Sequence, residues 1–212
     1  MEDLKSVVAA LRVGGVAIYP LLFLAVIAAV VIIEKGFVFA MRTRPPGPLL
    51  QAIDIDRIAW DEFEQRLGTV MPQNYFGRFI RTIFDNRKRP IWWLESRAAE
   101  EAASIEQSLG RWLWVLETTV TAAPLLGLLG TITGMIRAFK LFGTEGLVDP
   151  RGVTGGVAEA LIATAVGLFI ALVALFAFNY FSQRQAAVMD EMEQLGTRLV
   201  DLIRLEGREI AP

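Results

Sequence analysis

Residues 123–139 read APLLGLLGTITGMIRAF, and residues 156–168 read GVAEALIATAVGL. The second stretch carries one carboxylate, Glu159, at the start of an otherwise uncharged apolar run that also contains Thr164. A carboxylate that enters a bilayer is costly unless it faces protein, water or a partner, so such a residue marks a functional site by default. Glu159 is therefore the first candidate for a functional site.

The composition indicates a membrane protein. Hydrophobic residues make up 54% of the chain and the mean hydropathy is +0.45, which is more apolar than an ordinary soluble domain of this length. There are no cysteines and no histidines, which excludes disulfides, thiolate nucleophiles and zinc sites built on these residues. With no recognisable phosphate-binding glycine motif either, we predict no enzymatic activity, no catalytic or metal-binding residues and no cofactor. The net charge of -2 argues against a nucleic-acid partner.

Three stretches are long enough to cross a bilayer as helices, which takes about 20 residues. They are Val13–Ile33, Thr118–Ile136 and Ala160–Gln183, and none of them contains a charged residue. Trp112 and Trp114 precede the second stretch, where interfacial aromatic anchors are expected. The sequence therefore predicts three transmembrane helices.

A cleaved signal peptide is the alternative interpretation of the first stretch. Its apolar region is longer than the usual 7 to 15 residues, and Glu2 and Asp3 interrupt what would be a basic leader. The pattern therefore favours a retained transmembrane helix.

Lysine and arginine residues predict the orientation, because their excess marks the cytoplasmic side. Before the first span lie only Lys5 and Arg12. The connection between the first two spans carries Arg42, Arg44, Arg57, Arg66, Arg78, Arg81, Arg87, Lys88, Arg89, Arg97 and Arg111. We therefore expect the N-terminus outside and the C-terminus in the cytoplasm. The predicted segments are an outer N-terminus (1–12), helix 1 (13–40), a cytoplasmic helical loop (41–111), helix 2 (112–140), a short outer connection (141–154), helix 3 (155–183) and a cytoplasmic C-terminal helix (184–212).

The predicted fold is all-α. The loop contains amphipathic pieces at 53–67, at 75–84 and from 92 onward, separated by turn signals. No proline interrupts 94–120, so helix 2 is predicted to extend into the cytoplasm as one helix, and helix 3 does likewise. An apolar stripe continues beyond helix 3, which favours packing within the same subunit over docking of a partner. Its residues are Val188, Met192, Leu195, Leu199 and Leu202.

Small residues recur at helical spacing in helices 2 and 3. Such faces let two helix backbones approach closely, which drives helix association in lipid. The predicted packing residues are Gly127, Gly130 and Gly134 on helix 2 and Gly167 on helix 3, within runs that also include Ala123, Gly156, Ala160, Ala163, Ala171 and Ala174. Pro124 removes one backbone donor and is expected to bend or loosen helix 2.

Two threonines accompany Glu159 as candidate pathway residues. Thr131 lies within helix 2, and Thr164 follows Glu159 on helix 3. A lone intramembrane threonine usually bonds the carbonyl four residues earlier, whereas with Glu159 the two predict a polar lining. At 100° per residue, Glu159 and Thr164 stand roughly 140° apart, so both cannot face the centre of a narrow pore.

The two quoted stretches resemble the signature of the MotA/TolQ/ExbB proton channel family. Three spans with a large cytoplasmic loop are similar to the ExbB/TolQ branch, because MotA-like members generally have four spans. The resemblance covers residues 121–169 specifically. It implies that Thr131, Glu159 and Thr164 occupy the family's functional polar positions and that Pro124 matches its proline.

The resemblance also implies a function and partners. An ExbB-like protein is a proton-channel and stator subunit of the bacterial inner membrane, with its N-terminus in the periplasm, and converts proton-motive force into mechanical work. It forms a homo-oligomer, a pentamer, around a single-span ExbD/TolR-like partner with a membrane aspartate. A TonB/TolA-like protein then transmits force, in the ExbB case to outer-membrane transport.

Other functions remain open from the residues alone. A TolQ-like subunit of the Tol-Pal cell-envelope system carries a similar local signature. A non-conducting structural scaffold would also have small-residue interfaces, but it has no need of Glu159. A substrate-carrying transporter is disfavoured because the three spans show no internal repeat.

Overall fold

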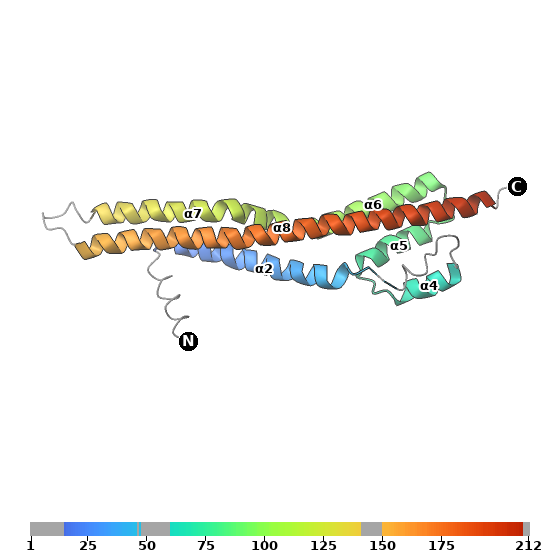
Figure 1. The fold of residues 1–212 in the computed structure, drawn as a ribbon, viewed down its shortest axis with the longest axis horizontal. Coiled ribbons are helices and arrows are strands. Elements are labelled where there is room, and N and C mark those ends of the chain that lie inside the picture. The colour runs from blue at the N-terminus through green and yellow to red at the C-terminus, as the bar shows by residue number, and fades with distance from the viewer. Residues whose placement is uncertain (1–14, 46, 48–59, 141–149, 210–212) are drawn as a thin grey trace. The chain divides into compact units, whose positions relative to one another are not determined.

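The computed structural model describes residues 15–45, 47, 60–140 and 150–209, and every element within these ranges is an α-helix (Figure 1). The helices are α2 (Ile18–Arg42), α4 (Trp60–Thr69), α5 (Tyr75–Asp85), α6 (Ile91–Gly110), α7 (Leu113–Lys140) and α8 (Pro150–Glu209). Three stretches are long and apolar enough to span a membrane: Ile18–Arg42, Ile91–Lys140 and Val153–Glu206. The all-α prediction is confirmed, and the chain is a multi-pass membrane protein.

The first described helix begins at Ile18, and residues 13 and 14, where the sequence predicted the start of helix 1, lie outside the described residues. Gly15 has a φ of 65° in the left-handed region, and the regular helix starts only at Ile18. Pro20 lies in the first turn of α2, where a missing backbone N–H costs no hydrogen bond. The predicted segments 1–12 and 53–59, and residues 141–149 of the outer connection, lie outside the described residues.

A short break divides the helix that the sequence predicted as continuous over 94–120. The chain leaves α6 after Gly110, and Arg111 adopts an extended conformation with a ψ of 132°. Trp112 then has a φ of 69°, which is unusual for a residue with a side chain. The two residues after Gly110 have non-helical backbone angles and interrupt the helix. The absence of proline was therefore not enough to predict one continuous helix.

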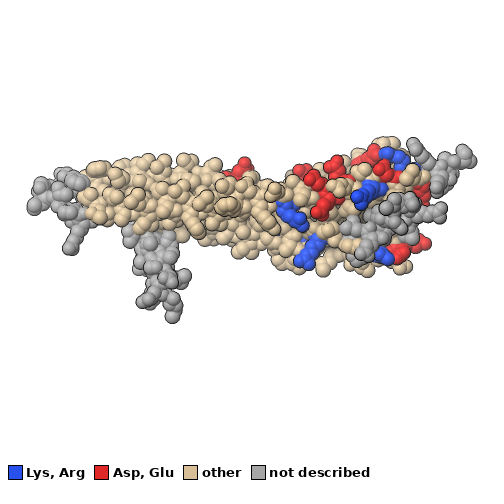
Figure 2. Space-filling model, viewed as in Figure 1, with Lys and Arg blue, Asp and Glu red and all other residues tan. Residues whose placement is uncertain are grey.

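The described helices form two compact units. The first contains residues up to Ile33 and Trp112–Tyr180. Its apolar cluster joins Leu21 of α2, Ala123 of α7, and Ile170 and Ala171 of α8. The visible face of α7 and the first part of α8 is almost free of charge in Figure 2. Large side chains point outward from these helices, among them Leu125 (65% exposed), Phe169 (68%) and Phe176 (72%). Such apolar faces suit contact with lipid or with other subunits.

The second unit contains Glu34–Arg111 and the chain from Phe181 onward. Three residues of the α8 stripe, Val188, Met192 and Leu199, are buried in the single chain, in line with packing inside the same subunit. Gly196 lets α8 approach the Phe79 ring, since a Cβ there would lie 2.9 Å from it.

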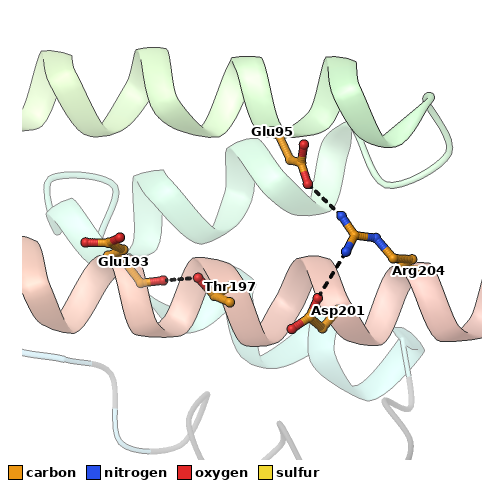
Figure 3. A network of polar contacts seen from close by, with 5 residues as sticks. All are labelled: Glu95, Glu193, Thr197, Asp201 and Arg204. Carbon is orange, nitrogen blue, oxygen red and sulfur yellow. Dashed lines mark hydrogen bonds and ion pairs between the residues drawn. The ribbon is translucent and has the colours of Figure 1, made fainter.

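Ion pairs join the outer surfaces of two helices in the second unit. Arg204 of α8 pairs with Glu95 of α6 at 2.7 Å and with Asp201 at 3.6 Å (Figure 3). Both pairs are well exposed and so contribute little to stability. The buried stripe of α8, not these charges, therefore holds the unit together.

A fully buried lysine links α2 to the end of α6 in the second unit. Lys35 has no exposed surface, and its Nζ donates hydrogen bonds to the carbonyl oxygens of Leu109 (2.8 Å) and Ser108 (3.5 Å). The last carbonyls of a helix lack partners within that helix and carry its negative partial charge. The ammonium group of Lys35 therefore caps the C-terminus of α6.

We expect Lys35→Met to destabilise the protein, by about 2 kcal/mol. Methionine fills a similar volume, but it leaves the carbonyl oxygens of Leu109 and Ser108 buried without a donor. Thermal unfolding in detergent measures the change, and Lys88→Met is the control, because Lys88 is exposed. Equal stability of the two variants would contradict the capping role, and would mean that the cost of burying the ammonium group cancels its bonds.

Candidate functional site between helices α7 and α8

Helices α7 and α8 pack closely through small residues. A Cβ atom placed on the predicted packing glycines would lie 2.5 to 3.0 Å from an atom of the opposite helix, at Gly127, Gly130, Gly134 and Gly167. The contacts pair the start of α7 with later residues of α8, so the two helices run antiparallel. The structure thus places all four glycines at one helix interface (Figure 1).

Thr131 and Thr164 lie together at this interface. Their hydroxyl groups are in hydrogen-bond contact, and each also lies within hydrogen-bond distance of the carbonyl oxygen of Gly127, at 3.3 Å from Thr131 and 3.0 Å from Thr164. Because each hydroxyl has one hydrogen, two of these three bonds form at a time. Thr131 therefore bonds the carbonyl four residues earlier, as a lone helical threonine does. Thr164 instead bonds across to α7, so the pair is a polar link between the two helices.

Glu159 lies at another part of the same interface and contacts Arg137. The Oε1 atom of Glu159 accepts a hydrogen bond from Nη1 of Arg137 at 2.8 Å. The Glu159 side chain is 23% exposed, and that of Arg137 is 49% exposed. A Cβ placed on Gly15 would lie 1.6 Å from Oε1 of Glu159, so the carboxylate occupies the space that the glycine leaves open. Glu159 is thus held between the end of α7 and the chain that enters α2.

The structure separates the predicted polar residues into two groups. Thr131 and Thr164 form one contact, and Glu159 forms another with Arg137. This agrees with the helical geometry, by which Glu159 and Thr164 cannot face the same narrow axis. Pro124 lies inside α7, one turn before Gly127, and the helix continues through it.

Sequence reasoning missed two residues of this site. Neither Arg137 nor Gly15 was predicted as a site residue. The positive φ of Gly15 could not be read from the sequence, although a Gly-Gly pair before an apolar run is a recognisable turn signal. Arg137 could have been found by asking which cation an acid at the mouth of an apolar helix pair requires.

The chemistry available here is ion binding, not bond making. Within the described ranges, no group of three or more Asp, Glu, His or Cys side chains could hold a metal ion. The polar groups described above are a carboxylate, which accepts hydrogen bonds, a guanidinium, which donates them, and two hydroxyls, which do both. The fold and this site define a class: a multi-pass helical membrane protein with an ionisable group at a helix interface.

Comparison with known proteins identifies the family. Residues 72–194 match the model described as the MotA/TolQ/ExbB proton channel family. This is more than half of the chain, and it includes α7 and the part of α8 that carries Glu159 and Thr164. The chain belongs to this family, as the resemblance of the two quoted stretches predicted.

Named relatives lie in two branches. A putative biopolymer transport protein ExbB-like 1 of Synechocystis is 30% identical over 191 residues, covering 88% of this chain and 74% of that protein. The biopolymer transport protein ExbB of Xanthomonas campestris is 37% identical over 113 residues, covering 53% of this chain and 45% of that protein. The Tol-Pal system protein TolQ of Pseudomonas aeruginosa is 42% identical over 79 residues, covering 37% of this chain and 34% of that protein. The chain is thus an ExbB/TolQ-family proton channel subunit, a class of channel and motor subunits and not of enzymes.

Proposed function

We propose that this chain is the stator subunit of a bacterial inner-membrane motor that converts proton-motive force into mechanical work. Glu159, Thr131 and Thr164 contribute to its ion pathway. The observation that supports this most is the position of Glu159, whose carboxylate is held at the α7–α8 interface within the stretch that matches the proton channel family. A structural scaffold would have no use for a carboxylate there.

The working assembly in this proposal is a homopentamer around a single-span ExbD/TolR-like partner. The three predicted spans, 13–33, 118–136 and 160–183, contain no acid of their own. The partner's membrane aspartate therefore supplies the titrating group at the centre, and the subunits supply a ring of Glu159 and threonines. Protonation of the aspartate changes its contacts with the ring, and repeated switching drives movement.

The proposed orientation has the N-terminus in the periplasm and the C-terminus in the cytoplasm. The twelve lysine and arginine residues between the first two spans, Lys35 among them, support it, because positive residues stay on the cytoplasmic side. The unit formed by Glu34–Arg111 and the chain from Phe181 onward is then the cytoplasmic part.

The proposed task is to energise TonB-dependent transport across the outer membrane. The ExbB names of the relatives that cover most of this chain support this branch. The TolQ relatives keep the Tol-Pal system as the second candidate, since their short matches have higher identity. The genes beside this one separate the two, because each system carries its own partner proteins.

Proton flux in reconstituted vesicles tests the proposal. We expect vesicles that hold both this chain and its single-span partner to take up protons under an applied membrane potential, as reported by an internal pH-sensitive dye. Vesicles with this chain alone serve as the control and are expected to remain at the background rate, as are vesicles in which the partner's membrane aspartate is changed to asparagine. Replacing the proton gradient with a sodium gradient tests which ion is carried.

Flux that is independent of the partner would contradict the proposed division of labour. A complex that assembles but carries neither ion would contradict the motor itself and favour the scaffold function.

A further inference from the structure

Arg137 has a position that the family assignment does not explain. It lies in the last turn of α7, and its guanidinium binds the carboxylate that the proposed function places on the ion pathway, with Nη1 and Oε1 at 2.8 Å. Gly15 confines the same carboxylate from another element, because the space of its absent side chain is filled by Oε1. Glu159 is therefore positioned by two partners, of which only Arg137 is charged.

An arginine beside a pathway carboxylate has two effects on ions. The guanidinium stays protonated at every physiological pH, so it can always donate a hydrogen bond to Oε1 of Glu159. Its fixed positive charge also repels other cations that approach the carboxylate, as arginines in selective pores do. A proton or a partner group that approaches Glu159 therefore competes with the ion pair for the carboxylate.

We propose that Arg137 is a positioning residue that keeps Glu159 unavailable in the resting subunit, and so limits passive proton leak. This rests on the proposed function, since it assigns the regulation of that same site. Opening of the pair is then coupled to the partner, which offers Glu159 an alternative contact when it moves. Arg137 does not act on Thr131 and Thr164, because their hydrogen-bond contacts are with each other and with the carbonyl oxygen of Gly127.

Five variants of the complete complex with its partner test the proposal by passive proton leak in vesicles, the single Glu159→Gln variant among them. Arg137→Gln should raise the leak by about tenfold, the change expected from losing one partly screened ion pair. Lys140→Gln is the matched control, because it removes the same charge from the same last turn without touching the pair, and should leave the leak unchanged. Arg137→Lys keeps the charge and should restore most of the wild-type barrier. The double variant Arg137→Gln/Glu159→Gln should leak no more than Glu159→Gln alone.

The outcomes separate this inference from the proposed function. If Glu159→Gln stops conduction while Arg137→Gln behaves like Lys140→Gln, the positioning role is overturned and the motor stands. If Arg137→Gln raises the leak equally with or without Glu159, it acts by another route and the inference is again overturned. If Glu159→Gln conducts like the wild type, the assignment of Glu159 to the ion pathway fails and this inference fails with it, while a complex that carries no ion would contradict the motor itself.

Discussion

Glu159→Gln yields an assembled complex that no longer carries protons or energises its partner. Glutamine has the shape of glutamate and retains an oxygen that can accept from Arg137, but it lacks the negative charge that the carboxylate places on the pathway. Positioned groups in proton transfer typically contribute factors of 10² or more, so we expect driven proton flux to fall by about a hundredfold. Glu159→Ala is expected to give the same loss.

Assembly is expected to survive this substitution because of where Glu159 lies. The close contacts between α7 and α8 are made by its neighbour Ala160 and by the glycines, whereas Glu159 contacts Arg137 and the Gly15 region. Native mass spectrometry of the purified complex checks the assembly, and the vesicle assay checks the flux.

Glu117→Gln is the matched control for the loss of one acid. Glu117 is an exposed residue on the same α7, and it stands before the uncharged part of the helix. Its replacement should preserve flux. If Glu159→Gln and Glu117→Gln both conduct like the wild type, the Glu159 carboxylate has no part in the ion pathway, and conduction depends on other groups.

Apolar length and helical spacing were sufficient to predict the architecture. An uncharged run of about 20 residues is long enough to span the bilayer, and in lipid an α-helix provides hydrogen bonds for the backbone N–H and C=O groups of such a run. The loop helix α5 was also predicted within one residue, at 75–84 against Tyr75–Asp85, because it has an amphipathic pattern. The structure adds its N-cap, Asn74, whose side chain accepts from the N–H of Gly77. Breaks without proline were not predicted: at Arg111 and Trp112 only the backbone angles reveal the end of α6.

Some members of the candidate site could be proposed from the sequence, but not their pairings. Glu159, Thr131 and Thr164 are polar groups in apolar runs, and the family resemblance assigned functional roles to the same three positions. Which residue of α7 faces which residue of α8 depends on the register of the two helices. Once the contact of Gly134 with Ala160 is known, the antiparallel direction brings Arg137 to Glu159. A sequence gives the small faces of both helices, but not how far one is shifted along the other.

Burial of Lys35 is a further result that the sequence could not provide. A lysine near the end of an apolar helix is usually expected to extend to the interface and remain hydrated. Here the end of α6 is close enough to accept its hydrogen bonds, at Leu109 and Ser108. The contact joins residues far apart in the chain, so no local pattern predicts it.

Gly167→Ala is expected to push α7 and α8 apart, because it places a methyl group where glycine has only a hydrogen atom. A Cβ at this position would lie 2.5 Å from the carbonyl oxygen of Ala123 and 3.1 Å from the Cα of Gly127. Both obstacles are backbone atoms, so no side chain can rotate away and the helices must move apart. Overpacking of this kind costs typically 1 to 3 kcal/mol, and we expect about 3 here because helix association in lipid depends on such contacts.

The same substitution at Gly155 gives the opposite expectation. Gly155 lies on the same α8, and a Cβ there meets nothing within 4 Å, so Gly155→Ala should be neutral or stabilise the helix by up to about 1 kcal/mol. Resistance of the purified protein to unfolding by a denaturing detergent measures both variants. Because helix propensity favours alanine at both sites, only interface packing can make Gly167→Ala the weaker protein. If the two variants unfold alike, α7 and α8 do not pack in the observed register, and the contact between Arg137 and Glu159 that depends on this register must be rejected with it.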